Sequence, residues 1–169
     1  ASPEAEESLI ACCLIDGTET IPLCVEAGIT AESFYDPVCR LMFEHLTNLQ
    51  NDRQPTDAVM LAESLKKAGQ LDSCGGIIRL SKIQDRAPTT AHRAYFIQEI
   101  RNNHLRRQLI EAVTRKLDYV LTASTPDLLT IHALQVASLR KLAQTDRTGL
   151  VERVAYTWFN RFAALRFLD

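Results

Sequence analysis

The sequence predicts an all-α protein, and three observations support this fold class. Apolar residues recur at three- and four-residue steps, the spacing of one helical face, and no pair of segments before residue 146 alternates like paired strands. Proline and acidic residues stand where helices are expected to begin, and glycine stands where they are expected to end. The 169-residue chain is 46% hydrophobic, so it can bury a normal globular core.

Five short helices are expected in a compact head over residues 1–88. The first begins at Ser2-Pro3, where a hydroxyl cap and a proline precede acidic residues at the positive end of the helix dipole. It is expected to run to about Ile15 and to stop at Asp16-Gly17. The other four are expected from about Thr20 to Gly28, from Asp36-Pro37 onward, from Pro55-Thr56-Asp57 to Gly69, and after Gly75-Gly76.

Residues 89–145 are expected to form an antiparallel helical hairpin. Between Thr89 and Ala123 there is neither glycine nor proline, which favours one long helix or two in near continuation. Thr125-Pro126-Asp127 then caps a helix that reaches about Gln144. A short connection between two long helices is typical of antiparallel neighbours.

The second helix of this hairpin has an unusually wide apolar face. Its apolar residues cover more than half of the circumference, whereas one neighbour covers a stripe of about 100°. They are Leu128, Leu129, Ile131, Leu134, Val136, Leu139, Leu142 and Ala143. The width predicts a second partner, and we take Leu128, Ile131, Leu139 and Leu142 as candidate interface residues. The alternative is that the head folds back onto this face.

Residues 146–169 are expected to form a linker or an appended amphipathic helix. Gly149 should break the preceding helix, and apolar residues from Leu150 onward recur at helical spacing. A single helix of this length is marginal in water, and exposed aromatic residues favour aggregation. We therefore expect Trp158, the only tryptophan, to be buried against the hairpin or a neighbouring chain, and we add it to the interface candidates.

No motif in the sequence indicates catalysis, a cofactor or a metal. A phosphate-binding G-x-x-x-x-G-K-[ST] loop is missing, so the chain is expected to show no ATPase activity. There is no G-x-S-x-G nucleophile and no carboxylate pair in an apolar setting. The histidines are scattered, and the five cysteines contain no C-x-x-C, so they are expected to be reduced and mostly buried: His45, His92, His104 and His132, and Cys12, Cys13, Cys24, Cys39 and Cys74.

Charge is distributed unevenly along the chain. Residues 1–36 contain eight acidic side chains and no lysine or arginine, so this part should not bind a phosphate backbone. A basic cluster at Arg101, Arg106, Arg107, Arg115 and Lys116 is more typical of a solvated helix face. Direct nucleic-acid binding is therefore expected to be weak or absent, and a helical DNA-binding domain is disfavoured. Neither a signal peptide nor a membrane span is recognisable, which favours a cytoplasmic location.

The order of segments over residues 2 to about 144 resembles the N-terminal domain of DnaB-type replicative DNA helicases. The matching segments are Glu4-Ala5-Glu6 leading to Leu14-Ile15-Asp16, Phe34-Tyr35 with Arg40 and Phe43, Pro55-Thr56-Asp57 leading to Leu61–Leu65, Gly69–Gly76, and Pro88-Thr89 with Tyr95 and Ile97. Cys39, Arg79 and His92 stand where the family usually has histidine, an aromatic residue and asparagine.

The resemblance implies a non-catalytic collar domain of an ATP-dependent DNA helicase. Such a domain self-associates, as a dimer or as the collar of a hexameric ring, and docks primase or a helicase loader. The segment Val151–Phe167 resembles instead a short helix near the start of the PglX family of phage-defence adenine methyltransferases. The alternative is thus an assembly domain of a DNA-modifying defence protein, while a helix linking the collar to a helicase motor also fits this segment.

Overall fold

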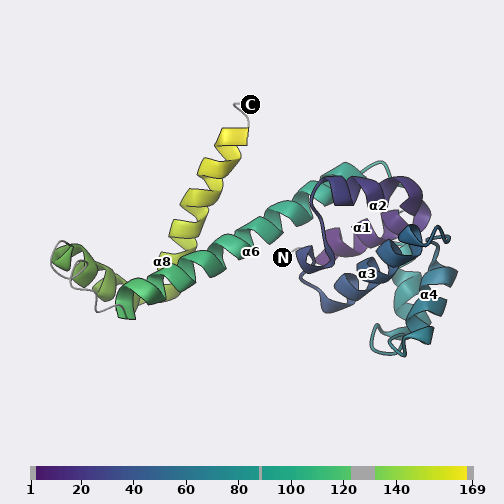
Figure 1. Ribbon diagram of the computed structural model, residues 1–169, viewed down its shortest axis with the longest axis horizontal. Helices are drawn as coiled ribbons and strands as arrows, with labels where there is room; N and C mark the ends of the chain where they lie inside the picture. Colours follow the sequence, from purple (N-terminus) through teal and green to yellow (C-terminus); the bar gives the residue numbers. More distant parts are fainter. Residues whose placement is uncertain (1–2, 88, 123–131, 167–169) are drawn as a thin grey trace. The chain divides into compact units, whose positions relative to one another are not determined.

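The computed structural model describes residues 3–87, 89–122 and 132–166, and these residues form helices and connecting turns without any strand (Figure 1). The expected all-α fold is therefore confirmed. The chain divides into two compact units, Ala1–His104 and Leu105–Asp169, with the division inside one long helix. The boundaries that the sequence suggested near residues 88 and 145 stay predictions.

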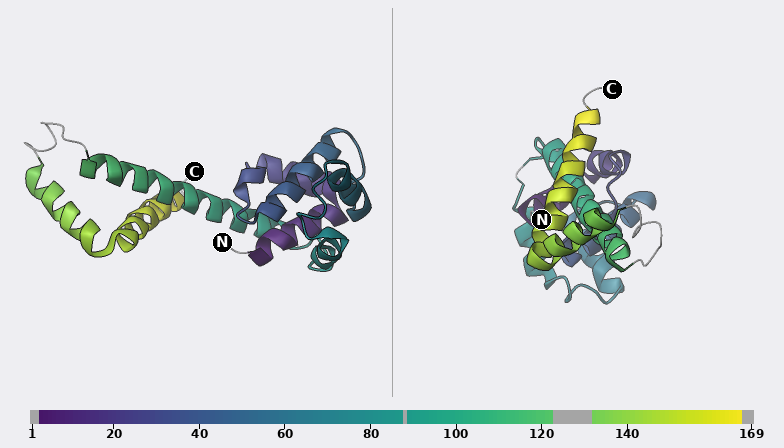
Figure 2. Two further views of the ribbon diagram at one scale, coloured as in Figure 1. Left: turned by 90° about the horizontal axis from the view of Figure 1, so that it is seen from below. Right: turned by 90° about the vertical axis from the view of Figure 1, so that its left-hand side faces the viewer.

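The first unit is built around α1. Its elements are α1 (Pro3–Ile15), α2 (Gly17–Glu26), the 3₁₀ helix η1 (Ala31–Ser33), α3 (Pro37–Asn51), α4 (Ala58–Lys67), α5 (Gly76–Gln84) and the first turns of α6 (Arg93–Thr122). Helix α1 packs against α2, α3 and α5, and Figures 1 and 2 show it inside this group. Leu9, Ile10 and Ala11 are fully buried along it, which fits a helix with neighbours on several sides. Ile97 and Ile100 of α6 complete the same core.

Aspartate side chains cap three helices of this unit. Asp36 Oδ1 accepts a hydrogen bond from the N–H of Val38 at 2.8 Å, and Asp57 Oδ1 accepts one from Met60 at 2.9 Å, at the two starts that the sequence predicted. The expected start of the second helix near Thr20 was wrong. The helix begins at Gly17, because Asp16, expected only to stop α1, also caps α2 by accepting from the N–H of Glu19 at 3.3 Å.

The side chain of Thr56 lies against the backbone of Gly17 at the start of α2. A Cβ atom at this position would lie 2.1 Å from Thr56 Oγ1 and 2.7 Å from Thr56 Cβ, so the threonine, which is buried, would have to move. We expect Gly17→Ala to lower the free energy of unfolding by about 1–3 kcal/mol, although alanine is the better helix former. Urea denaturation followed by circular dichroism measures this change.

The matched control for this prediction is the double variant Gly17→Ala/Thr56→Gly. The double variant lacks the side chain that the new methyl group would meet. Its loss in free energy of unfolding should therefore be smaller than the sum of the losses of the two single variants. Additive losses would show that the contact between residues 17 and 56 is not the cause.

All five cysteines are free and buried, as the sequence indicated. A hydrogen bond with the thiol of Cys24, together with burial, raises the pKa of Cys13. Burial also raises the pKa of Cys39. These thiols stay protonated at neutral pH and serve as small apolar groups in the core.

The second unit is a hairpin formed by α6 from Leu105 onward and α8 (Ala133–Arg166). The two helices run antiparallel: Leu121 contacts Arg140, Asp118 pairs with Arg147, and Arg106 lies over the ring of Phe159. Figure 2 shows the same arrangement. One cluster of buried side chains consists of Leu117, Leu150 and Val151, with Val113, Leu121, Leu139 and Ala143 packed around them.

Helix α8 is broken at Asp146, whose φ and ψ angles of −154° and 81° are not helical. The carboxylate of Asp146 accepts a hydrogen bond from the N–H of Gly149 at 2.8 Å and so caps the second segment. The sequence placed the break at Gly149, and this was wrong by three residues because the aspartate, and not the glycine, interrupts the helix.

Candidate assembly interface

The candidate interface residues predicted from the sequence differ in how exposed they are in the structure. Leu128 and Ile131 lie outside the described residues. Leu139 is half-buried within the hairpin core, so it contributes to the fold of the unit. Leu142 and Trp158 are 50% and 45% exposed, which leaves both open to a partner.

The first segment of α8 carries an exposed apolar stripe. Leu134 is 82% exposed and, with Leu142, borders a shallow hollow that is also lined by Gln135, Ser138 and Leu139. Leu134, Ser138 and Leu142 follow one another at four-residue steps and therefore share a face of the helix. Leu134 belongs to the wide apolar face predicted from the sequence. The sequence alone did not indicate which part of this face α6 covers.

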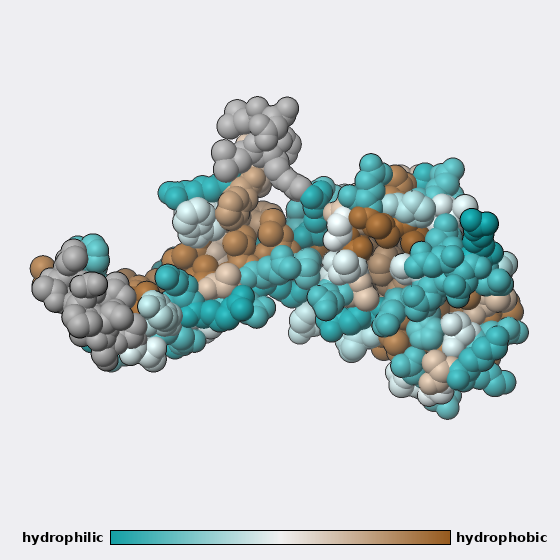
Figure 3. All heavy atoms as spheres, viewed as in Figure 1, coloured by the Kyte–Doolittle hydropathy of each residue, from teal (hydrophilic) through white to brown (hydrophobic). Residues whose placement is uncertain are grey.

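A second apolar stripe follows the break at Asp146. Val154, Trp158 and Phe162 are partly exposed at four-residue steps along α8. The Trp158 and Phe162 ring centroids are 5.8 Å apart, and the guanidinium of Arg161 lies 5.4 Å from the indole centroid. Trp158 also borders a groove with Val113, Leu117 and Val120 of α6, and Figure 3 shows hydrophobic residues (brown) gathered along this unit.

These contacts leave Trp158 45% exposed, so the hairpin of its own chain does not bury it. Its burial against a neighbouring chain stays a prediction. The physical reason is that two helices form a core only along the line between them. Apolar residues on their outer faces therefore stay in water unless another molecule covers them.

Some histidine and carboxylate side chains in the described part of the chain hold neighbouring segments together. His45 bridges two neighbours, with Nδ1 2.7 Å from Ser64 Oγ and Nε2 2.9 Å from Gln70 Oε1. No group of three such side chains that could hold a metal ion is present there. None of the helices in the described ranges is long and apolar enough to span a bilayer.

Comparison with known families identifies this fold. Residues 1–102 match the family model described as DnaB-like helicase N terminal domain. The chain belongs to this family. The crystal structure of the N-terminal domain of DnaB helicase from Mycobacterium tuberculosis superimposes with a TM-score of 0.65 at 26% identity, covering 85% of this chain and 94% of that one.

Curated proteins similar to this chain include replicative DNA helicases. The replicative DNA helicase DnaB of Synechocystis sp. is 29% identical over 163 residues, which is 96% of this chain and 18% of the relative. That of Leifsonia xyli is 26% identical over 129 residues, which is 75% of this chain and 28% of the relative. The chain thus spans less than a third of the length of these relatives.

The similarity to the helicases extends into the C-terminal segment. Because the Synechocystis alignment covers 96% of the chain, most of residues 146–169 align with a helicase. The resemblance of Val151–Phe167 to the PglX family receives no support from these relatives.

Arg79, which stands where the family usually has an aromatic residue, joins three elements by ion pairs. Its Nη2 lies 2.6 Å from Asp36 Oδ2 at the start of α3 and 3.5 Å from Glu7 Oε1 of α1. Arg86 Nε lies 2.9 Å from the other oxygen of Glu7. The arginine thus links α5 to α1 and to the start of α3 by partly exposed ion pairs, each worth no more than about 1 kcal/mol.

Proposed function

We propose that this chain is the non-catalytic N-terminal domain of a replicative DNA helicase and that its hairpin drives self-association, as a dimer or as the collar of a hexameric ring. The family match supports the helicase assignment, and the exposed apolar stripe of α8 carries the proposal of self-association. The complete protein would be an ATP-dependent DNA helicase that acts in the cytoplasm. The motor chemistry would lie outside the 169 residues considered, since they contain no phosphate-binding loop.

The hairpin suits this role because two copies can bury the same stripe against each other. A contact of that kind is symmetric, so Leu134 and Leu142 of each copy would face the stripe of the other. Long helices transmit a displacement along their length, and two arrangements of paired hairpins would give the collar two widths. Primase or a helicase loader would dock on the assembled collar, which would present surfaces from more than one copy.

We expect Leu134→Glu/Leu142→Glu to convert the associated protein to monomer. Both side chains are exposed, so the helical circular dichroism signal should persist, whereas a change at half-buried Leu139 would also weaken the hairpin itself. Sedimentation velocity at about 100 μM, where an association of micromolar affinity is nearly complete, measures the outcome. Trp158 emission should shift to longer wavelength if the tryptophan is buried in the same assembly.

The matched control is Val59→Glu/Ile78→Glu, which places the same charges on two exposed apolar positions of the first unit. This control should associate like the wild type. A wild-type chain that sediments as a monomer would contradict the proposal, and so would equal dissociation of the two double variants.

A further inference from the structure

The two units of the chain carry opposite charge. Residues 1–104 contain nine lysines and arginines and fifteen acidic side chains, a net charge of −6. Residues 105–169 contain ten basic and six acidic side chains, a net charge of +4. When two copies of the chain approach each other, the negative first unit of one copy attracts the positive second unit of the other.

Helix α2 presents an acidic and apolar stripe in the first unit. Glu19, Leu23 and Glu26 follow at steps of four and three residues, so they lie in line on one face, and all three are exposed. At 1.5 Å per residue the two carboxylates are about 10 Å apart along the helix, with the leucine between them. Glu19 is also paired with Arg93 at 2.8 Å, but its side chain is 66% exposed.

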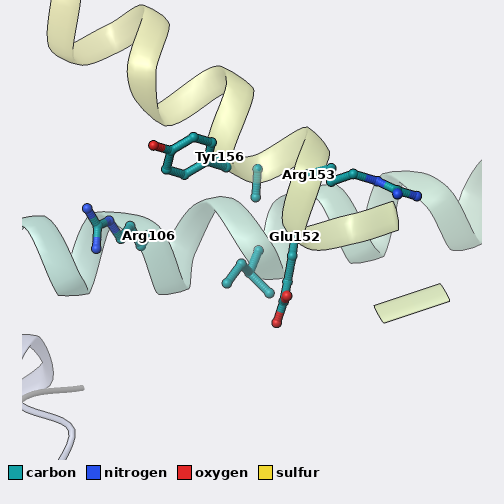
Figure 4. Close-up of a pocket in the computed structure, with 6 residues that line it drawn as sticks. Arg106, Glu152, Arg153 and Tyr156 are labelled. Carbon is teal, nitrogen blue, oxygen red and sulfur yellow. The ribbon is translucent and has the colours of Figure 1, made fainter. Parts of the chain in front are cut away.

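A groove in the second unit is lined by basic and apolar side chains together. It lies between α6 and the second segment of α8, has a volume of about 360 Å³, and is lined by Arg106, Ile110, Glu152, Arg153, Ala155 and Tyr156. Figure 4 shows Arg106 and Tyr156 at one end and Arg153 extending away at the other. The groove is also lined by the apolar side chains of Ile110 and Ala155.

The position of Arg106 is fixed by its own unit. Its guanidinium carbon lies 4.6 Å from the centroid of the Phe159 ring, a cation–π contact that leaves the charge available. A held guanidinium loses less conformational entropy when it binds a carboxylate than a free one does. The groove therefore offers a preorganised cation beside an apolar floor.

We propose that the α2 stripe of one copy docks into this groove of a second copy. Leu23 would cover Ile110 and Ala155, and Glu19 and Glu26 would pair with Arg106 and Arg153 at the two ends. The groove volume lies within the range of ligand pockets, which suits one face of a short helix. A nucleic-acid strand fits less well, since its phosphates would meet Glu152 and its charge would leave the apolar floor unmatched.

This contact rests on the proposed self-association and extends it. Hairpin pairing joins two copies symmetrically, whereas the α2 contact joins two different surfaces and so runs head to tail. If hairpin pairing and the α2 contact alternate from copy to copy, they can together close a ring of copies. Assembly should then depend on salt, because the added contact is electrostatic.

Charge exchange between two variants tests the contact. Glu19→Lys/Glu26→Lys makes the stripe basic, and Arg106→Glu/Arg153→Glu makes the groove acidic. Each variant alone should associate at least about tenfold more weakly than the wild type, because like charges then face each other. An equimolar mixture should regain association, since the basic stripe of one variant fits the acidic groove of the other. Sedimentation velocity and its dependence on sodium chloride between about 50 and 500 mM are the measurements.

Glu19→Lys also removes the ion pair with Arg93, which could lower the stability of the first variant. Two further variants separate this effect from a loss of the proposed contact. Leu23→Glu/Glu26→Lys leaves Glu19 unchanged and should weaken association to a similar extent. Glu32→Lys/Glu44→Lys makes the same change of net charge at exposed positions outside the stripe and should associate like the wild type.

Several outcomes would overturn the proposal. Unchanged association in both charge variants would do so, and dissociation by Leu134→Glu/Leu142→Glu in the same series would then leave the proposed function standing. A mixture that stays dissociated, with recovery only when all four substitutions are in one chain, would assign the contact to a single chain. Binding of a labelled single-stranded oligonucleotide that only Arg106→Glu/Arg153→Glu abolishes would assign the groove to nucleic acid. A monomeric wild type would remove both proposals.

Discussion

Replacing Glu6 with alanine is expected to lower the free energy of unfolding by about 2–4 kcal/mol, although glutamate in the first turns of a helix is ordinarily worth less than 1 kcal/mol. Glu6 is only 2% exposed. Its two carboxylate oxygens accept hydrogen bonds from the backbone N–H groups of Tyr35 and Asp36, each at 2.9 Å. Truncation leaves both donors without this acceptor at the turn that leads into α3. Urea denaturation followed by far-UV circular dichroism gives the value.

The control for Glu6 is Glu4→Ala in the same turn of α1. Glu4 is exposed, so its loss removes only a favourable charge near the helix start and should cost less than about 1 kcal/mol. Glu6→Gln retains the shape but offers one acceptor oxygen in place of two, so its stability should lie between those of the wild type and Glu6→Ala. Equal losses at Glu4 and Glu6 would show that the two hydrogen bonds do not fix the turn.

Glu4 is exposed and Glu6 is buried, although both lie in the first turns of α1. This difference shows which features of the fold the local sequence can predict. Helix starts at Asp36 and Asp57 were predictable because a cap involves atoms only two or three residues apart. The burial of Glu6 was not, since its partners lie 29 and 30 residues away and its local context is an ordinary helix start. Hydrogen bonds between distant segments leave no periodic signal in the sequence.

The exposed apolar face of α8 could be predicted from the sequence only as a region, not residue by residue. The width of the apolar arc on α8 indicated that α6 could not cover all of it, and Leu134 and Leu142 are indeed exposed. Which half of the arc turns toward α6 depends on how two helices pack, so Leu139, chosen from the same arc, belongs to the hairpin core. The groove beside Arg106 was missed because its two sides are about 45 residues apart in sequence. Opposite net charges in the two halves were the available signal.

The largest loss of stability is expected from Phe34→Ala, at about 3–5 kcal/mol. The Phe34 ring is fully buried, and its centroid lies 4.9 Å from that of Phe43 on α3. Removing it leaves a cavity that the surrounding helices can fill only in part. The backbone carbonyl of Phe34, which accepts a hydrogen bond from Arg40 Nη2 at 3.0 Å, is retained, so the loss reports mainly on the ring.

Tyr35→Ala provides the matched control for Phe34→Ala, because it removes an aromatic ring from the adjacent residue. Tyr35 is 61% exposed, and its backbone N–H still binds Glu6 after the substitution, so the loss should stay below about 1 kcal/mol. Phe34→Leu should fall between the two, at about 1–2 kcal/mol, since leucine fills part of the cavity. A loss at Tyr35 as large as that at Phe34 would mean that the outward-facing ring contributes to the stability of the fold, and the assignment of the core around α1 and α3 would then be wrong.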